Sequence, residues 1–329
     1  MPEYSKPWLT LDEQVDKLES RGVTVVSRAE GRDLLAKIGY YRLSGYLYPF
    51  RLSETYIDDG RQKVRVLADY RAGTTVAYAA ELIDFDRRLR VLVLEGVERI
   101  EVSLRMQVAY TLGERSAFAH QDPKSYTSSF TAEHLDEETG EQRPSKLSRM
   151  LARIQDRQNG SDEAFVAHFR DRYDGRLPIW ALTEILEFGQ LGQLFGGLQN
   201  DLASRIAATY AVPTKKMFGS WISSLNYVRN VSAHHARLFN RMLVIAPSRP
   251  TFEQVPLLGH LRTEDGSKAT FGTYNALAIM AYLISVIDPS CDWNRRLAAQ
   301  LHDFPQGALS LADMGVPLGW ETQALWTRG

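Results

Sequence analysis

The chain has 329 residues, of which 44% are hydrophobic and 24% are charged, a balance typical of a globular protein with an apolar core. Its 39 Lys and Arg residues nearly cancel its 40 Asp and Glu residues. This excludes a histone-like polycation and an acidic disordered tail, but it leaves room for a local basic surface. The single cysteine, Cys291, excludes an intramolecular disulfide framework and a cysteine-rich metal site.

Two segments bear on where the protein acts. The opening residues MPEYSKPWLTLDEQ are charged and lack an apolar stretch, so we expect no signal peptide. The most apolar run, residues 274–287, is too short to span a bilayer and predicts a buried helix. With one cysteine, these features predict a cytoplasmic protein without membrane contact.

Apolar residues recur at helical spacing in the N-terminal third. Thr10 and Glu13 form a capping-box pattern ahead of a helix over residues 11–18, and a second helix over 28–38 ends at Gly39. The aromatic segment 38–50 predicts a turn and a short helix. The longest periodic segment predicts a helix over 75–112, in which Gly96 is a candidate for a bend.

The rest of the chain continues this helical pattern after a long polar loop at 114–146. No alternating pattern is strong enough to predict a sheet, so the expected fold class is all-α. We expect an N-terminal helical region over 1–70, a helical domain over 71–303 and a loop-like tail over 304–329. Within the domain, the later helices are expected at 146–159, 163–173, 180–198, 201–210, 216–241, 274–287 and 293–302.

The helix expected at 216–241 carries the candidate chemistry. At about 100° per residue, Asn230, His234 and two arginines fall on one stripe, with Arg229 beside it; the two arginines are Arg237 and Arg241. Imidazole moves protons near neutral pH, and guanidinium binds phosphate oxygens. The pattern therefore indicates RNA phosphodiester cleavage, with Asn230 orienting the imidazole or holding the phosphate. The alternative is a packed or solvated histidine, with arginines that stabilise the carbonyl end of a helix.

Other features leave two interpretations open. The aromatic residues of 38–50 can stack RNA bases beside Arg42, or they can pack between helices. Arg87, Arg88 and Arg90 can contact an RNA backbone or form a solvated face. The histidines lack metal-ligand spacing and no glycine-rich nucleotide loop is present, so no metal and no cofactor are expected.

A family resemblance adds to this pattern. Residues 229–234 read R-N-x-x-x-H, which is similar to the R-x4–6-H signature of the HEPN superfamily. The longer string VRNVSAHHARLFNR, residues 228–241, resembles the Abi-like abortive-infection family (the AbiD/AbiF group). Segments 6–22, 38–50, 85–105 and 177–195 resemble other parts of that family in the same order. The resemblance covers about residues 6–300.

The resemblance implies a HEPN-type multi-helix bundle with an N-terminal helical extension. It implies a metal-independent endoribonuclease that acts as a toxin and cuts RNA to arrest growth in abortive infection, with Arg229, Asn230 and His234 as catalytic residues. The expected supporting or RNA-binding residues are His235, Arg237 and Arg241, together with Glu98, Glu101 and Arg105 on the preceding long helix. For Glu101 and Arg105, an ordinary pair on a solvated helix face is the alternative.

The resemblance also bears on partners. HEPN active sites are commonly built from two facing motifs, and this chain has one, so a homodimer is implied, with Leu238 or Phe239 at its contact. A noncoding RNA or antitoxin partner is compatible with the family. Two other functions stay open: a non-catalytic RNA-binding or regulatory HEPN protein, and a structural adaptor without RNA affinity.

Overall fold

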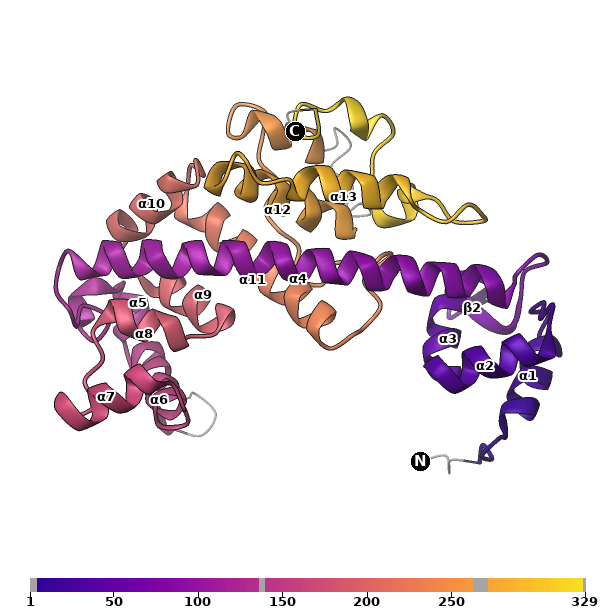
Figure 1. Cartoon of the computed structure of the whole chain (residues 1–329), viewed down its shortest axis with the longest axis horizontal. Helices are drawn as coiled ribbons and strands as arrows, with labels where there is room; N and C mark the ends of the chain where they lie inside the picture. The colour runs from indigo at the N-terminus through magenta and orange to yellow at the C-terminus, as the bar shows by residue number, and fades with distance from the viewer. Residues whose placement is uncertain (1–4, 136–139, 263–271, 328–329) are drawn as a thin grey trace. The chain divides into compact units, whose positions relative to one another are not determined.

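The computed structural model describes residues 5–135, 140–262 and 272–327, and this part of the chain is mostly helical (Figure 1). The all-α fold class expected from the sequence is therefore confirmed. The chain divides into two compact units. One ends at Arg90 and also contains Ala299–Asp313, and the other contains Val91–Ala298 and the residues from Met314 onward. The expected domain boundary at residue 70 lies inside the first unit.

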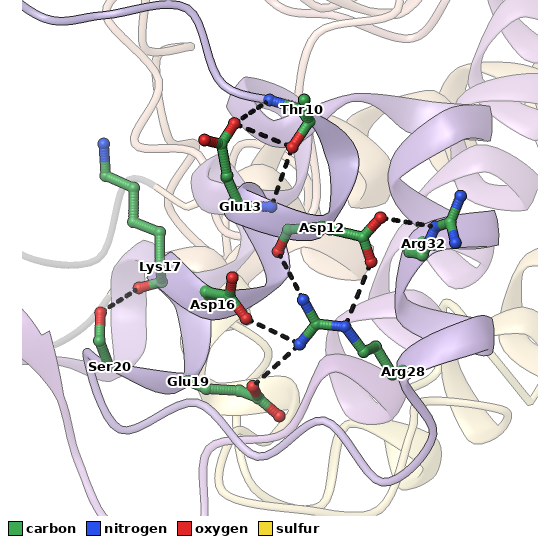
Figure 2. A network of polar contacts seen from close by, with 9 residues as sticks. All are labelled: Thr10, Asp12, Glu13, Asp16, Lys17, Glu19, Ser20, Arg28 and Arg32. Atoms are coloured by element: carbon green, nitrogen blue, oxygen red, sulfur yellow. Dashed lines mark hydrogen bonds and ion pairs between the residues drawn. The ribbon is translucent and has the colours of Figure 1, made fainter.

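The first unit begins with two helices that are joined by charged side chains. Helix α1 (Leu11–Glu19) starts at the expected capping box, in which the Thr10 amide donates to Glu13 Oε2 at 2.7 Å. Figure 2 shows Arg28, the first residue of α2 (Arg28–Ile38), reaching the acidic face of α1. Its guanidinium lies 2.7 Å from Asp16 Oδ1 and 3.2 Å from Asp12 Oδ1. These pairs gather the carboxylates of α1 on the side that faces α2.

A β-hairpin follows α3 (Tyr40–Leu47) and the short 3-10 turn η1 (Tyr48–Phe50). Strands β1 (Arg51–Asp58) and β2 (Arg61–Tyr70) pair antiparallel. Asp59 and Gly60 connect them with positive φ at both positions, the backbone of a tight hairpin turn. The expectation of no sheet was wrong here. Nearly all the hairpin residues are exposed, so no buried apolar face imposes an alternating pattern on the sequence. The sequence signal for the hairpin was the Asp59-Gly60 pair, which is typical of a tight turn between two strands.

A buried polar cluster joins α3 to the first turns of α4 (Val76–Gly113). The Tyr46 hydroxyl donates to Asp86 Oδ2 at 2.5 Å, and Arg90 forms an ion pair with the same carboxylate. Burial raises the pKa of Tyr46, so its hydroxyl stays a donor. A buried carboxylate needs such partners, because an unpaired one is strongly destabilising. Arg90 thus has a structural role in the basic cluster, and Arg87 pairs with the exposed Asp84.

The second unit contains the rest of α4 and most of the later helices. Helix α12 is buried over nearly all of its length, as its apolar sequence predicts. In the described part of the chain, no helix combines the length and apolarity needed to cross a bilayer. Two paired segments of two residues each, β3 and β4, lie in the polar region that was expected to be a loop. The described elements that follow α4 in the chain, whichever unit they belong to, are η2 (Pro123–Ser125), α5 (Ser128–Thr131), β3 (His134–Leu135), β4 (Gln142–Arg143), α6 (Lys146–Asn159), α7 (Ala164–Arg172), α8 (Ile179–Ile185), α9 (Phe188–Gly197), α10 (Asn200–Thr209), α11 (Lys215–Ala233), η3 (Pro256–Leu261), α12 (Thr273–Ile287), α13 (Trp293–His302), η5 (Leu311–Met314) and η6 (Trp320–Thr322).

Helix α4 continues through Gly96 without interruption (Figure 1). A Cβ atom at Gly96 would lie 2.6 Å from Met280 Cε and 2.8 Å from the Trp293 ring. That ring is held in place, because Trp293 Nε1 donates to the Leu92 carbonyl at 2.9 Å. Glycine at this position therefore serves the close packing of α4 against α12 and α13.

The single helix expected over 180–198 is two helices, α8 and α9. Leu186 and Glu187 are extended, and the Glu187 amide donates to Gln190 Oε1 at 2.9 Å to start α9. Two arginines satisfy carbonyl groups at the break: Arg157 donates to Ile185 and Arg105 donates to Leu186, each at 3.0 Å. These contacts depend on residues distant in sequence, so apolar periodicity does not reveal the break.

Candidate functional site

The candidate site lies at the C-terminal end of α11, whose orientation is fixed by its buried face. The Thr214 hydroxyl accepts from the Met217 amide at 3.1 Å and caps the helix start. Trp221, Leu225 and Val228 are fully buried, and Trp221 Nε1 donates to the Ser248 carbonyl at 2.8 Å. Helices α9, α10 and α12 pack against α11. The last turn of α11 therefore extends from a well-anchored helix.

Helix α11 ends at Ala233, so the expected continuation to Arg241 was wrong. The Ala236 amide donates to the Val231 carbonyl and the His235 amide donates to the Ser232 carbonyl, both at 3.0 Å. With His235 at φ 56°, this is the Schellman arrangement that closes helix ends, with histidine where glycine is usual. The turn directs Leu238 and Phe239 into the interior, where both are fully buried. The dimer contact expected at these two residues was therefore wrong.

Arg229, Asn230 and His234 lie at the C-terminal end of α11. Arg229 Nη1 donates to Asn230 Oδ1 at 3.1 Å. His234 is the C-cap residue, and its amide donates to the Asn230 carbonyl at 3.0 Å. Arg229 and Asn230 are half-buried, and the His234 side chain is exposed. Asn230 thus contacts Arg229 through its side chain, whereas the sequence predicted that it orients the imidazole or holds a phosphate.

The bond to Asn230 leaves much of the Arg229 guanidinium for another acceptor. A guanidinium carries five N–H donors in a planar fork, and this bond uses one of them. The amide oxygen of Asn230 restricts the rotation of that fork without neutralising its charge. An exposed imidazole one turn further along completes a pair of groups that can bind an anion and move a proton.

Arg237 and Arg241 lie beyond the helix end, so the predicted single stripe with Asn230 and His234 does not form. The chain nevertheless brings Arg241 back to α11. Its Nη1 atom lies 3.3 Å from the Tyr227 hydroxyl, and its Nε donates to the Arg237 carbonyl at 2.8 Å. Thr273 at the start of α12 donates to the Leu238 carbonyl at 2.7 Å and anchors this returning segment.

The predicted supporting residues on α4 are placed differently. Glu98 is exposed, while Arg105 lies 2.5 Å from Glu101 in an i,i+4 pair. Arg105 also donates to the Leu186 carbonyl at the α8–α9 break. Among the described residues, no hydrogen bond or ion pair joins these three side chains to Arg229 or His234. Their supporting role stays a prediction.

Two residues near the site were not singled out from the sequence. Tyr227 contacts Arg241. Asn226 packs closely against Gly189 of α9, since a Cβ atom placed at Gly189 would lie 3.2 Å from Asn226 Nδ2. Asn226 precedes Asn230 by one helical turn, and this i,i+4 spacing was the available signal for it. Tyr227 and Arg241 cannot be paired by helical spacing, because the chain leaves the helix between them.

In the described ranges, no group of three or more His, Cys, Asp or Glu side chains is arranged to hold a metal ion. The family model described as Abi-like protein matches residues 33–240, more than half of the chain, and this range includes Arg229, Asn230 and His234. No curated protein and no solved structure matches the chain.

Proposed function

The chain belongs to the Abi-like protein family, which indicates abortive-infection phage defence, and we propose that it acts there as a metal-independent endoribonuclease of the HEPN type. In this proposal the protein is a toxin that cuts RNA and arrests growth. The observation that carries the proposal is the last turn of α11, where Arg229 is held by Asn230 one turn before the exposed His234. Anion binding and proton transfer are the two functions that metal-free RNA cleavage requires.

The proposed reaction uses the 2′-hydroxyl of the RNA as nucleophile. His234 accepts the 2′-hydroxyl proton while O2′ forms a bond to the adjacent phosphorus, and the bond from phosphorus to the 5′-oxygen breaks. The leaving 5′-oxygen takes up a proton from solvent and His234 releases its proton to solvent, so the products are a 5′-hydroxyl and a 2′,3′-cyclic phosphate. No water enters this step and no electrons are transferred.

Arg229 and Asn230 have distinct roles in this reaction. The Arg229 guanidinium binds nonbridging phosphate oxygens and offsets the negative charge that grows on them as the phosphorus becomes five-coordinate. Asn230 is a positioning residue, because its side-chain oxygen accepts a hydrogen bond from Arg229 at 3.1 Å. His235 and Arg241 flank the site and are proposed to contact neighbouring parts of the RNA.

The proposal is tested with purified protein and mixed single-stranded RNA on denaturing gels. His234→Ala should reduce cleavage roughly 100- to 10,000-fold, the range that a general acid or base contributes. Arg229→Ala should also abolish cleavage, and Arg229→Lys should restore little of it, because an ammonium lacks the planar fork. Both alanine variants should lose the growth arrest on overexpression while keeping a helical circular-dichroism spectrum.

His168→Ala is the matched control, since His168 is an exposed histidine on α7. It should cleave RNA like the natural chain. Full cleavage by both folded alanine variants would overturn the site assignment. RNA binding without cleavage by the natural chain, weakened in Arg229→Ala and His234→Ala, would instead identify a non-catalytic RNA-binding protein.

A further inference from the structure

The aromatic cluster of residues 38–50 divides into a buried part and an exposed part. Tyr46 and Phe50 are buried, as expected of packing between helices, but Tyr41 is 78% exposed and Tyr48 is 50% exposed. Tyr41 and Tyr48 are seven residues apart along consecutive helical turns, so they lie on the same face. Between them, a Cβ at Gly45 would meet no atom within 4 Å. The face is therefore open and aromatic.

A groove of about 650 Å³ adjoins Tyr41 within the first unit. Residues 6–9 and helix α1 form one side, and the end of α2 and start of α3 form the other. Its aromatic lining consists of Tyr40, Tyr41 and Trp8, which is 84% exposed. Single exposed apolar side chains are common on protein surfaces, but three aromatic rings at one groove provide flat surfaces for a ligand.

The charges around this groove are positive. Lys6 and Lys17 line it, and none of its described lining residues is acidic. Lys17 Nζ lies 5.8 Å from the centre of the Tyr40 ring, and Arg21 donates to the Tyr40 hydroxyl at 3.3 Å. The face of the Tyr40 ring is thus paired with the Lys17 cation at the groove.

Helix α1 separates its charges between two faces. Figure 2 shows Asp12, Asp16 and Glu19 directed toward Arg28, while Lys17 points away from that network. These three carboxylates are therefore engaged with α2, whereas Glu13, one turn before Lys17, accepts hydrogen bonds from Thr10. Among the described residues that line the groove itself, the charged ones are Lys6 and Lys17.

We propose that this aromatic groove binds a segment of single-stranded RNA. Bases stack on Trp8 and Tyr41, and Lys6 and Lys17 contact the phosphates, the combination that single-strand binding proteins use. An aromatic groove also suits a proline-rich peptide, but two lysines and no acid among its described lining residues favour a polyanion. The inference relies on the proposed ribonuclease function only for the choice of RNA as the nucleic acid. It concerns a surface that is separate from the α11 residues in sequence and in compact unit.

The test uses the full chain carrying His234→Ala, so that RNA is not cleaved during the measurement. Fluorescence anisotropy follows binding of a labelled single-stranded RNA roughly 12 nucleotides long, within the site sizes of single-strand binding folds. Because base stacking contributes about 1–3 kcal/mol per base, Trp8→Ala and Tyr41→Ala should each raise the Kd roughly 5- to 150-fold. Lys17→Gln should lower the slope of log K against log salt by about 0.7, the value for one phosphate contact on a single strand.

Tyr110→Ala is the matched control, because Tyr110 is 71% exposed on α4 and belongs to the second unit. Its RNA affinity should equal that of the His234→Ala parent. Unchanged affinity in Trp8→Ala and Tyr41→Ala, with intact circular-dichroism spectra, would overturn the proposal. So would binding of a proline-rich peptide or of anionic vesicles that depends on Trp8 while RNA binding does not.

The groove and the ribonuclease proposal fail in different ways. If RNA binding depends on Trp8 and Tyr41 but the natural chain cleaves no RNA, the groove stands and the catalytic proposal fails. If the natural chain cleaves RNA and the two aromatic variants bind it normally, the catalytic proposal stands and the groove fails.

Discussion

Replacement of His235 by glycine separates the stability of the helix end from its function. His235 adopts φ 56°, a left-handed conformation that costs an ordinary L-residue roughly 1–2 kcal/mol. Glycine adopts this conformation without that cost, but its greater freedom in the unfolded chain lowers the free energy of unfolding by roughly 0.5–1 kcal/mol. We therefore expect His235→Gly to raise the free energy of unfolding by about 0.5–1 kcal/mol. In a domain of roughly 150–250 residues, this corresponds to about 1–4 °C in Tm.

Calorimetry measures the stability change, and the RNA cleavage assay measures the functional one. If His235 supports the proposed site, His235→Gly should be more stable and less active, whereas a residue that only closes the helix would gain stability without losing activity. His235→Asn is the control, because asparagine tolerates the left-handed region better than most residues and carries no imidazole. A lower Tm for His235→Gly would refute the strain argument, since the histidine side chain would then stabilise the fold through contacts of its own.

Four further predictions address the site and the core. Cleavage should persist in EDTA, because the proposed nucleophile is the 2′-hydroxyl and the proposed base is His234; activity that stops in EDTA and returns with magnesium would contradict this. Sedimentation at micromolar protein should show a homodimer that a noncleavable RNA strengthens, and an active strict monomer in both conditions would exclude a shared site. Gly96→Ala should destabilise the chain by roughly 1–2 kcal/mol, because overpacking against Met280 and Trp293 outweighs the gain in helix propensity. Gly196→Ala is the control and should not destabilise the chain, because a Cβ there meets no atom within 4 Å. Burial lowers the pKa of His120 to about 4, so the neutral imidazole contributes fully to the free energy of unfolding above pH 6.5, and about 2–4 kcal/mol of this free energy is lost as the pH falls to 4. In urea unfolding, the stability of His120→Leu should therefore depend less on acid than that of the natural chain.

The helices could be predicted from the sequence because their boundaries depend on nearby residues. The cap at Thr10 and the apolar spacing of α2 and α6 act within one or two turns, and the expected ranges agree with the structure. The hairpin was missed because its side chains are exposed on both faces, so burial imposes no alternation on the sequence. The break before α9 was missed because Arg105 and Arg157, which satisfy its carbonyl groups, come from other helices.

The candidate site could be predicted only in part for the same reason. Arg229 and Asn230 are adjacent in sequence and Asn230 precedes His234 by one helical turn, so α11 alone places all three near its C-terminal end. The position of Arg241 depends on a tertiary contact with Tyr227 after the chain has turned. Helical spacing predicted Arg241 on one stripe with Asn230 and His234, but the chain leaves the helix at Ala233, before that stripe can form.

The end of α11 explains how one segment can combine a buried helix with an exposed imidazole. Trp221, Leu225 and Val228 are fully buried on one face of α11, and by helical spacing Asn230 and His234 lie on the opposite face. His234 is therefore exposed as the C-cap residue on the outer face of the helix. The turn at His235 stops the helix at Ala233 and directs Leu238 and Phe239 into the core. The strained backbone at His235 thus serves the return of these apolar residues to the interior.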